Sequence, residues 1–257
     1  MSLKAKLREK KPNFGTWITI AHPEVVEIAS TVPFDWLMFD MEHSPLDIQT
    51  LEIMLPGLNG SEITPLVRVP WNDFVTIKRV LDLGFDGILV PWVNSKDEAK
   101  KVVEACQYPP VGIRGTGPRR CIRYGAKDIL EYYNKFEKER LVIAIQVETQ
   151  KSLDNLTEIL SVEGIDVAFI GPNDLSASLG IFRQFNHPKF TEALKKVVRA
   201  CEETGKVAGI MTSGSEDAKK RLEEGFKFIA LAHDFSNLRR AFQNELNSVK
   251  SFLEKGK

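Results

Sequence analysis

The chain has 257 residues, of which 43% are hydrophobic, a proportion that can bury a full core. Lys plus Arg and Asp plus Glu both number 35, so the formal net charge is zero. No basic field is therefore expected to attract nucleic acid or anionic lipid, and a small-molecule partner is favoured. At this length we expect one domain over residues 1–257.

Three features bear on where the protein works. The three cysteines, Cys106, Cys121 and Cys201, are far apart in the sequence, which is typical of reduced thiols. The basic segment at residues 1–11 is followed by no apolar signal core. No stretch approaches the roughly 20 apolar residues of a membrane span. We expect a cytoplasmic protein that binds no membrane.

Short β-branched or aromatic runs recur along the chain, and segments with helical spacing lie between them. A glycine stands a few residues before several of the runs, where a helix C-cap is expected. The runs are residues 14–20, 34–39, 65–69, 87–93, 141–147, 166–170, 206–211 and 226–231, and the glycines are Gly84, Gly164, Gly205 and Gly225.

Eight strand–helix units in a chain of this length favour a (β/α)8 barrel. A doubly wound open sheet is the main alternative, but no G-x-G-x-x-G follows the first run. Residues 108–123, rich in Pro, Gly and Arg, are expected to form a long loop above the exit of the fourth strand. The last helix, residues 235–255, is long and partly apolar, and we expect a neighbouring subunit to cover it.

Polar residues follow several of the apolar runs. Because the carboxyl ends of barrel strands meet at one mouth, we expect these residues to lie together there. They are Asp40, Glu42 and His43 after the second run, Arg68 in the third, Gln146 and Glu148 at the fifth, and Asn173 and Asp174 after the sixth.

Two carboxylates in this set indicate a metal site. Gln146 and Glu148 are two residues apart on one strand, so their side chains point the same way, and Glu148 and Asp174 can share an ion. Oxygen donors without cysteine predict Mg²⁺ or Mn²⁺, with Co²⁺ as a further candidate in vitro. Two carboxylates leave coordination positions of the ion open, and a 2-oxo acid could fill two of them as a bidentate ligand.

Each of these residues, taken alone, also has a structural explanation. Arg68 could form a buried ion pair with Asp40, and Glu148 could cap the following helix. A lone His43 is more often a histidine with satisfied hydrogen bonds than a catalyst. Their joint occurrence at strand ends favours a site. His22 and His187, each before a proline, are expected to be caps or surface residues.

The chain resembles the HpcH/HpaI family of class II, metal-dependent pyruvate aldolases. The motifs that carry the resemblance span almost the whole chain in order. They are G-T-W at residues 15–17, F-D-W-L-M-F-D-M-E-H-S-P at 34–45, P-L-V-R-V-P at 65–70, V-P-W-V at 90–93, Y-P-P-V-G-I-R-G at 108–115, Q-V-E-T at 146–149 and F-I-G-P-N-D-L-S-A-S-L-G at 169–180.

The resemblance implies a pyruvate-type barrel that forms a hexamer, a dimer of trimers. It implies these roles: Glu148 and Asp174 as metal ligands, Arg68 as the enolate-stabilising cation, His43 as acid/base residue, Gln146 beside the metal, Asp82 of a neighbouring subunit paired to His43, and the amides of Asn173 and Asp174 near the substrate carboxylate. Asp40 and Glu42 are expected to support this site.

The implied reaction is reversible cleavage of a 4-hydroxy-2-oxo acid to pyruvate, or a close 2-oxo acid, and an aldehyde, as in the family members that act on 4-hydroxy-2-oxoheptane-1,7-dioate. The metal and Arg68 would disperse the enolate charge, and His43 would take the hydroxyl proton. A Schiff-base route is disfavoured because Lys206 and Lys227 lie at strand starts.

Two other functions stay open from the sequence. A related enolate chemistry, such as oxaloacetate decarboxylation or a malyl-CoA-type cleavage, would use the same residues. A non-catalytic metabolite-binding barrel is the alternative from another class. His233 stands where relatives usually have a small or apolar residue, and Asn173 replaces a commoner alanine. We therefore expect an altered aldehyde pocket, with Met211 and His233 among the substrate contacts.

Overall fold

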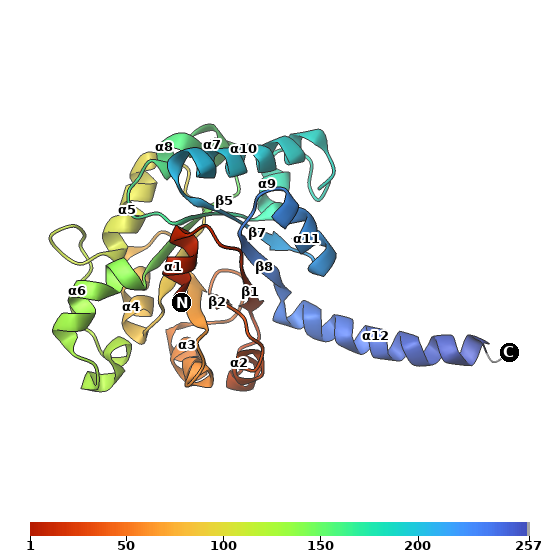
Figure 1. Ribbon diagram of the computed structural model, residues 1–257, viewed down its shortest axis with the longest axis horizontal. Coiled ribbons are helices and arrows are strands. Elements are labelled where there is room, and N and C mark those ends of the chain that lie inside the picture. Colours follow the sequence, from red (N-terminus) through yellow and green to blue (C-terminus); the bar gives the residue numbers. More distant parts are fainter. Residues whose placement is uncertain (256–257) are drawn as a thin grey trace.

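The computed structural model describes residues 1–255 as a closed barrel of parallel strands with helices around it (Figure 1). The strands pair in chain order, and the last pairs with the first, so the (β/α)8 prediction is confirmed over the open-sheet alternative. The strands are β1 Asn13–Ile18, β2 Trp36–Asp40, β3 Thr64–Arg68, β4 Gly87–Val90, β5 Val142–Val147, β6 Val167–Ile170, β7 Val207–Thr212 and β8 Phe228–His233.

The helices connect these strands and pack on the outside of the barrel. His22 and His187 accept hydrogen bonds as N-caps, as predicted, and Gly84 and Gly205 end their helices in the left-handed conformation. The elements are α1 Leu3–Arg8, α2 Pro23–Ser30, α3 Ile48–Met54, η1 Leu55–Leu58, α4 Phe74–Leu83, α5 Lys96–Cys106, η2 Arg120–Gly125, α6 Ile129–Glu139, α7 Gln150–Asp154, α8 Leu156–Leu160, α9 Pro172–Ser178, α10 Pro188–Thr204, α11 Ser215–Glu223 and α12 Asp234–Lys255.

Large side chains fill the interior of the barrel. Trp36 stacks on Phe228 with ring centroids 4.2 Å apart, and its indole Nε1 donates to Asn13 at 2.9 Å. Leu3 and Leu7 of α1 belong to the same buried cluster, so this helix closes the end of the barrel at which the strands start. The interior is therefore a packed core, which leaves the carboxyl ends of the strands as the open mouth.

The loop of residues 108–123 lies at the other end of the barrel from the one we predicted. Its backbone folds back on the carboxyl end of α5, where Ile113 N donates to Glu104 O, and Arg120 Nη1 donates to Leu83 O at the end of α4. The prediction was wrong because a barrel helix runs antiparallel to its strand, so a loop that follows α5 lies at the strand starts.

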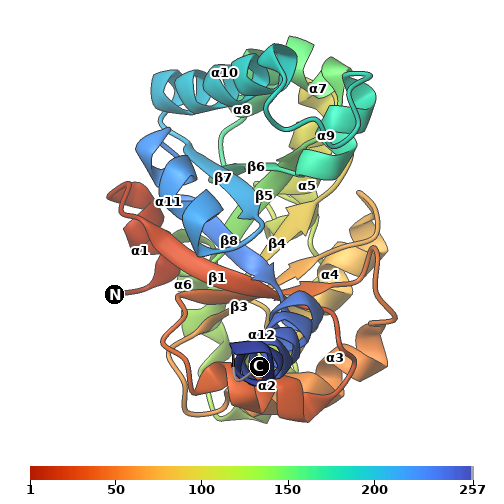
Figure 2. The same ribbon diagram turned by 90° about the vertical axis from the view of Figure 1, so that its right-hand side faces the viewer.

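The last helix, α12, extends away from the barrel in Figure 1 and points toward the viewer in Figure 2. The predicted long C-terminal helix is thus confirmed. Its apolar side chains are exposed in the single chain, up to 76% for Phe252. Within residues 1–255, no helix has the length and apolar character needed to cross a membrane.

Gly87 provides a test of the barrel's close strand packing. A Cβ at this position would lie 2.3 Å from the Val142 carbonyl oxygen and 2.9 Å from Leu66. Because the backbone of β5 cannot move away, we expect Gly87→Ala to lower the free energy of unfolding by about 2–3 kcal/mol. Urea titration followed by circular dichroism measures this change.

Gly117→Ala is the matched control for this substitution. No atom lies within 4 Å of a Cβ at Gly117, so the free energy of unfolding should change by less than about 0.5 kcal/mol. Equal stability of the two variants would contradict the described register of β4 on β5.

Candidate active site

A cavity of about 490 Å³ opens at the carboxyl ends of the strands. It brings together residues from every strand except β4, from the loop that follows β2 and from the start of α9. Of the residues predicted from the sequence, those that line it are Asp40, His43, Arg68, Gln146, Asn173, Asp174, Met211 and His233. Glu42 and Glu148 lie directly behind this lining, because Glu42 contacts Arg68 and Glu148 contacts Gln146.

Asp40 and Arg68 form a buried, two-point ion pair across β2 and β3, where the strand register sets them side by side. Arg68 Nε donates to Asp40 Oδ1 at 2.9 Å and Nη2 donates to Oδ2 at 2.8 Å. Burial alone would raise the pKa of Asp40, but Arg68 and the backbone N–H groups of Glu42 and His43 outweigh it and lower the pKa. The pair expected as a structural alternative therefore exists, and it forms a wall of the cavity.

Two further contacts fix the Arg68 guanidinium. Its Cζ atom lies 4.3 Å from the centroid of the Trp17 ring, and its Nη1 lies 2.9 Å from Glu42 Oε2. This last pair has ion-pair distance without hydrogen-bond geometry. Trp17 was not predicted as a site residue, although its place in the G-T-W motif was a usable signal.

Glu148 is a buried carboxylate with two hydrogen bonds. Its Oε1 accepts from the backbone N–H of Trp92 at 2.7 Å, and its Oε2 accepts from Gln146 Nε2. Trp92 donates from a left-handed backbone conformation, with φ of 56°, which is uncommon for a bulky residue. Sequence reasoning missed Trp92 because this role depends on a backbone angle.

Three carboxylates repel one another beside the cavity. Burial raises the pKa of Glu148 to about 7, and the charges of Glu42 and Asp174 add to the rise. Burial likewise raises the pKa of Glu42 to about 6, against the attraction of Arg68 and with the repulsion of Asp40 and Asp174. Arg68 is shared between Asp40 and Glu42, so it does not also balance the charges of Glu148 and Asp174.

The oxygen atoms here suit a hard divalent cation. Gln146 Oε1 is buried and has no hydrogen-bond partner, so an oxygen donor is left over beside Glu148. A Cβ at Gly171 would lie 2.8 Å from Gln146 Nε2 and 3.3 Å from Glu148 Oε2, so the glycine keeps this space free. Among residues 1–255, no group of three or more His, Cys, Asp or Glu side chains is arranged to hold a metal. An ion here would be coordinated by two carboxylates and an amide oxygen, and water or substrate would occupy its other coordination positions.

The remaining predicted residues surround the opening of the cavity. The His43 side chain is 65% exposed and its Nε2 lies 3.9 Å from Glu42 Oε2. Asn173 and Asp174 are exposed in the first turn of α9, and Met211 is half-buried on β7.

His233 is half-buried at the end of β8. Its ring centroid lies 5.8 Å from that of Trp17 and 5.2 Å from that of Phe235. Burial lowers the pKa of His233, against the opposing pull of the Asp40 and Asp234 carboxylates. A neutral imidazole both donates and accepts hydrogen bonds, so His233 suits a polar group better than a negative charge.

Asp82 does not line this cavity. It lies near the carboxyl end of α4, and its Oδ1 accepts from Arg114 Nη2 of the same chain at 2.8 Å. A single subunit therefore does not bring Asp82 to His43. The pairing of His43 with Asp82 of a neighbouring subunit stays a prediction.

Comparison with known proteins agrees with this geometry. Residues 13–241 match the family described as HpcH/HpaI aldolase/citrate lyase. A 5-keto-4-deoxy-D-glucarate aldolase of Shigella boydii serotype 18 (strain CDC 3083-94 / BS512) is 37% identical over 248 residues, which cover 96% of this chain and 95% of that protein.

Two solved structures are also similar. An HpcH/HpaI aldolase/citrate lyase family protein from Burkholderia cenocepacia J2315 has a TM-score of 0.91 and 29% identity, over 96% of this chain and 98% of that one. An HpcH/HpaI aldolase from Desulfitobacterium hafniense DCB-2 has a TM-score of 0.89 and 30% identity, over 97% of both chains. The chain therefore belongs to the HpcH/HpaI aldolase/citrate lyase family, which confirms the predicted resemblance and the predicted class of carbon–carbon lyase.

Proposed function

We propose that this aldolase reversibly cleaves a 4-hydroxy-2-oxo acid to pyruvate, or a close 2-oxo acid, and an aldehyde. The observation that carries the proposal is the meeting of a carboxylate pair, a buried arginine and an exposed histidine around one cavity. These are the groups that carbon–carbon cleavage next to a 2-oxo acid needs, because one carbon must leave with an electron pair while a hydroxyl loses its proton.

Family membership implies a divalent metal-dependent class II aldolase. We propose that Glu148 and Asp174 hold the ion, with Gln146 Oε1 beside them, and that the ion is Mg²⁺ or Mn²⁺, with Co²⁺ as a further candidate in vitro. When bound, the ion supplies a Lewis acid for the 2-oxo group. The buried Glu148 carboxylate, the charge of Asp174 acting on it and the free amide oxygen support this assignment.

Arg68 provides a fixed positive charge in the lining of the same cavity. Its Nε and Nη2 are bonded to Asp40, which sets the plane of the guanidinium. We assign Arg68 to stabilising the negative charge that develops on the pyruvyl oxygen during cleavage. Because it is already oriented by Asp40 and Trp17, little reorganisation is needed when the charge appears.

His43 is the group that we assign to proton transfer at the 4-hydroxyl. Its backbone N–H is bonded to Asp40 Oδ1 at 3.3 Å, which ties the loop to the ion pair, while the imidazole stays at the mouth. The amides of Asn173 and Asp174 open α9, where the first N–H groups have no helical carbonyl to bond, and we assign them to the substrate carboxylate.

For the substrate, we propose a polar, hydroxylated 2-oxo acid. The relatives named 5-keto-4-deoxy-D-glucarate aldolases make that compound the first to test, and 4-hydroxy-2-oxoheptane-1,7-dioate the second. The neutral His233 at the rim, with Met211 on the adjacent strand β7 in the same lining, supports a hydrogen-bonding contact to the aldehyde half.

We further propose a cytoplasmic homo-oligomer, a hexamer of the kind that the resemblance implies, in which residues 1–257 are one catalytic domain. The exposed apolar side chains of α12 support a covering subunit. Asp82 keeps partial exposure, which supports its use by a neighbour's His43. Three cysteines without disulfides support the cytoplasmic location.

The direct test follows pyruvate release from the two substrates above by protein that has been freed of metal and then given Mg²⁺, Mn²⁺ or Co²⁺. Metal-dependent release is expected. Turnover of oxaloacetate or of a CoA thioester alone would favour the related enolate chemistries. Binding of pyruvate without any turnover would favour a metabolite-binding barrel.

Glu148→Gln should affect stability in opposite directions with and without metal. In the unfolded chain this carboxyl titrates near 4.5, and in the folded protein its pKa is about 7. Between these values the folded protein retains a proton that the unfolded chain has lost, so stability falls as pH rises through that window and stays low above it.

Without metal, Glu148→Gln should therefore raise the melting temperature at pH 8 by a few degrees, for a gain on the order of 2 kcal/mol. The rise that Mn²⁺ gives the unaltered protein should be lost. Calorimetry at pH 5 and pH 8 measures both effects, with the exposed Glu192→Gln as control. A metal-free variant that is less stable at pH 8, or that is still stabilised by Mn²⁺, would rule out this ligand.

His43→Ala should separate proton transfer at the hydroxyl from chemistry at C3 of pyruvate. Aldol cleavage should fall at least about 100-fold, because the hydroxyl proton has no acceptor. Deuterium exchange at pyruvate C3, followed by proton NMR, should fall much less. His22→Ala, which removes an exposed helix cap, is the control. Equal losses in the two assays would remove His43 from the hydroxyl step.

His233→Ala should alter aldehyde preference and leave pyruvate exchange intact. The ring lies at the rim, and loss of a hydrogen bond to a polar aldehyde should cost about 10-fold in kcat/KM relative to an apolar aldehyde. Competition between the two aldehydes in the synthetic direction measures the ratio. An unchanged ratio would exclude His233 from the aldehyde contact.

A further inference from the structure

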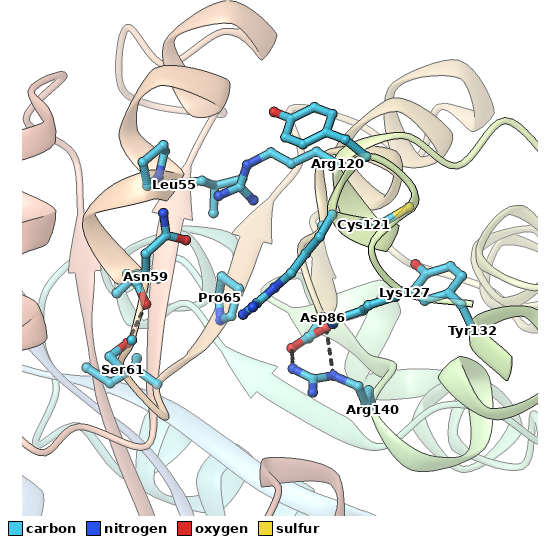
Figure 3. Close-up of a pocket in the computed structure, with 17 residues that line it drawn as sticks. Leu55, Asn59, Ser61, Pro65, Asp86, Arg120, Cys121, Lys127, Tyr132 and Arg140 are labelled. Atoms are coloured by element: carbon cyan, nitrogen blue, oxygen red, sulfur yellow. Dashed lines mark hydrogen bonds and ion pairs between the residues drawn. The ribbon is translucent and has the colours of Figure 1, made fainter. Parts of the chain in front are cut away.

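A second cavity, of about 470 Å³, opens at the end of the barrel where the strands start. Pro65 lies at the start of β3, Asp86 stands directly before β4 and Arg140 precedes β5. The segment from η1 to β3 forms one wall, and η2 with the start of α6 forms the other (Figure 3). The packed barrel interior separates this cavity from the proposed active site.

Positive charge predominates in the lining of this cavity. Four cationic side chains, Arg120, Arg123, Lys127 and Arg140, face a single carboxylate, Asp86. Arg140 Nε donates to Asp86 Oδ1 at 3.1 Å and its Nη2 donates to Oδ2, so this carboxylate is already neutralised. In a chain whose net charge is zero, the excess is a local feature of the cavity.

The other cations of the cavity have few partners of their own. Arg120 Nη1 donates to the carbonyl oxygen of Leu83 at 3.0 Å. Within the described chain, the side chains of Arg123 and Lys127 make no ion pair and no hydrogen bond. Charge-assisted donors are thus available to a ligand.

The cations also act on one another. Burial lowers the pKa of Lys127, and the positive charges of Arg140 and Arg123 lower it further. Burial lowers the pKa of Arg120 as well, and Arg123 adds to that effect. An anion between these groups would relieve both the desolvation and the repulsion.

The backbone of η2 places Arg123 at the cavity in a strained conformation. Arg123 and Tyr124 have φ of 48° and 55°, so two consecutive residues that are not glycine adopt the left-handed conformation. A residue in this conformation is strained and is retained where its surroundings require it. Here the two residues carry a cation and an aromatic ring into the same cavity.

The positive charge is spread along the wall. Figure 3 shows Arg120 at the upper side of the cavity, and Lys127 beside the Asp86–Arg140 pair at the lower side. Asn59 and Ser61 lie on the opposite wall and offer neutral polar groups. A ligand with two separated anionic groups would reach both ends of this arrangement.

We propose that this cavity is a second, non-catalytic binding site for a small organic anion that carries at least two carboxylate or phosphate groups. Arg123, Lys127 and Arg120 bind the anionic groups, and the wall that carries Asn59 contacts the carbon frame. The volume suits a small metabolite. No residue of its lining belongs to the active-site cavity that a single chain forms.

The test is isothermal titration calorimetry on the full chain, freed of metal so that neither probe binds through an ion at Glu148. Tricarballylate represents carboxylates, inorganic pyrophosphate represents phosphates, and glycerol is the neutral comparison. At constant ionic strength, saturable binding of one anion and none of glycerol is expected. The tighter of the two anions identifies the chemistry of the ligand.

Variants locate the binding. Arg123→Gln and Lys127→Gln should each weaken it about tenfold, which is the loss of one charge-assisted contact. Arg119→Gln is the matched control, because Arg119 is in the same loop and pairs with Glu52 outside the cavity, so it should change binding less than about twofold. Arg68→Lys should have no effect on the same titration.

Three results would overturn the proposal. One is the absence of saturable binding for both anions. Another is equal weakening by Arg119→Gln and Arg123→Gln, which would indicate a diffuse surface effect. The third is intact anion binding together with a changed oligomer mass in Arg123→Gln and Lys127→Gln, which would make the cavity a contact between subunits.

Discussion

The site depends on the repulsion among carboxylates at the mouth of the barrel. Burial raises the pKa of Glu148 to about 7, the charges of Glu42 and Asp174 add to the rise, and its hydrogen-bond donors are neutral. Such an arrangement costs stability in the absence of a cation and gives a strong preference for one. The unpartnered oxygen of Gln146 points to the same requirement. The metal binding and the enolate chemistry that we propose therefore depend on one electrostatic constraint.

The positive charge of Arg68, which is held rigidly, lies near these carboxylates and partly offsets their repulsion. Arg68 is fixed by two hydrogen bonds to Asp40 and by the Trp17 ring, so it balances part of the negative charge without filling the cation's place. The pair joins adjacent strands at matching positions, and the packed interior beneath it gives it support. Strand β3 thus supplies a fixed cation, and β5 with the start of α9 supplies oxygen donors, which together are the groups that the proposed aldol cleavage needs.

Much of the fold and part of the site could be predicted from the sequence, because these features depend on short stretches of residues. The apolar runs identified each strand to within a few residues, and Glu148 and Asp174 follow from their places at strand ends. The loop of residues 108–123 was misplaced because its position depends on the direction of α5. Trp92 was missed because its role rests on a backbone angle. The cationic cavity was signalled only in part, because the arginine-rich loop supplies Arg120 and Arg123, whereas Lys127 lies between η2 and α6 and Arg140 lies between α6 and β5.

The most direct measurement is deuterium exchange at C3 of pyruvate, followed by proton NMR in D₂O while Mn²⁺ is added to metal-free protein. It reports enolate chemistry without the need for the correct aldehyde. The account predicts no exchange above the rate in buffer without metal, and exchange that rises and saturates as the ion binds. An equal exchange rate in the metal-free protein would contradict it, because Glu148 and Asp174 would then not act by holding an ion.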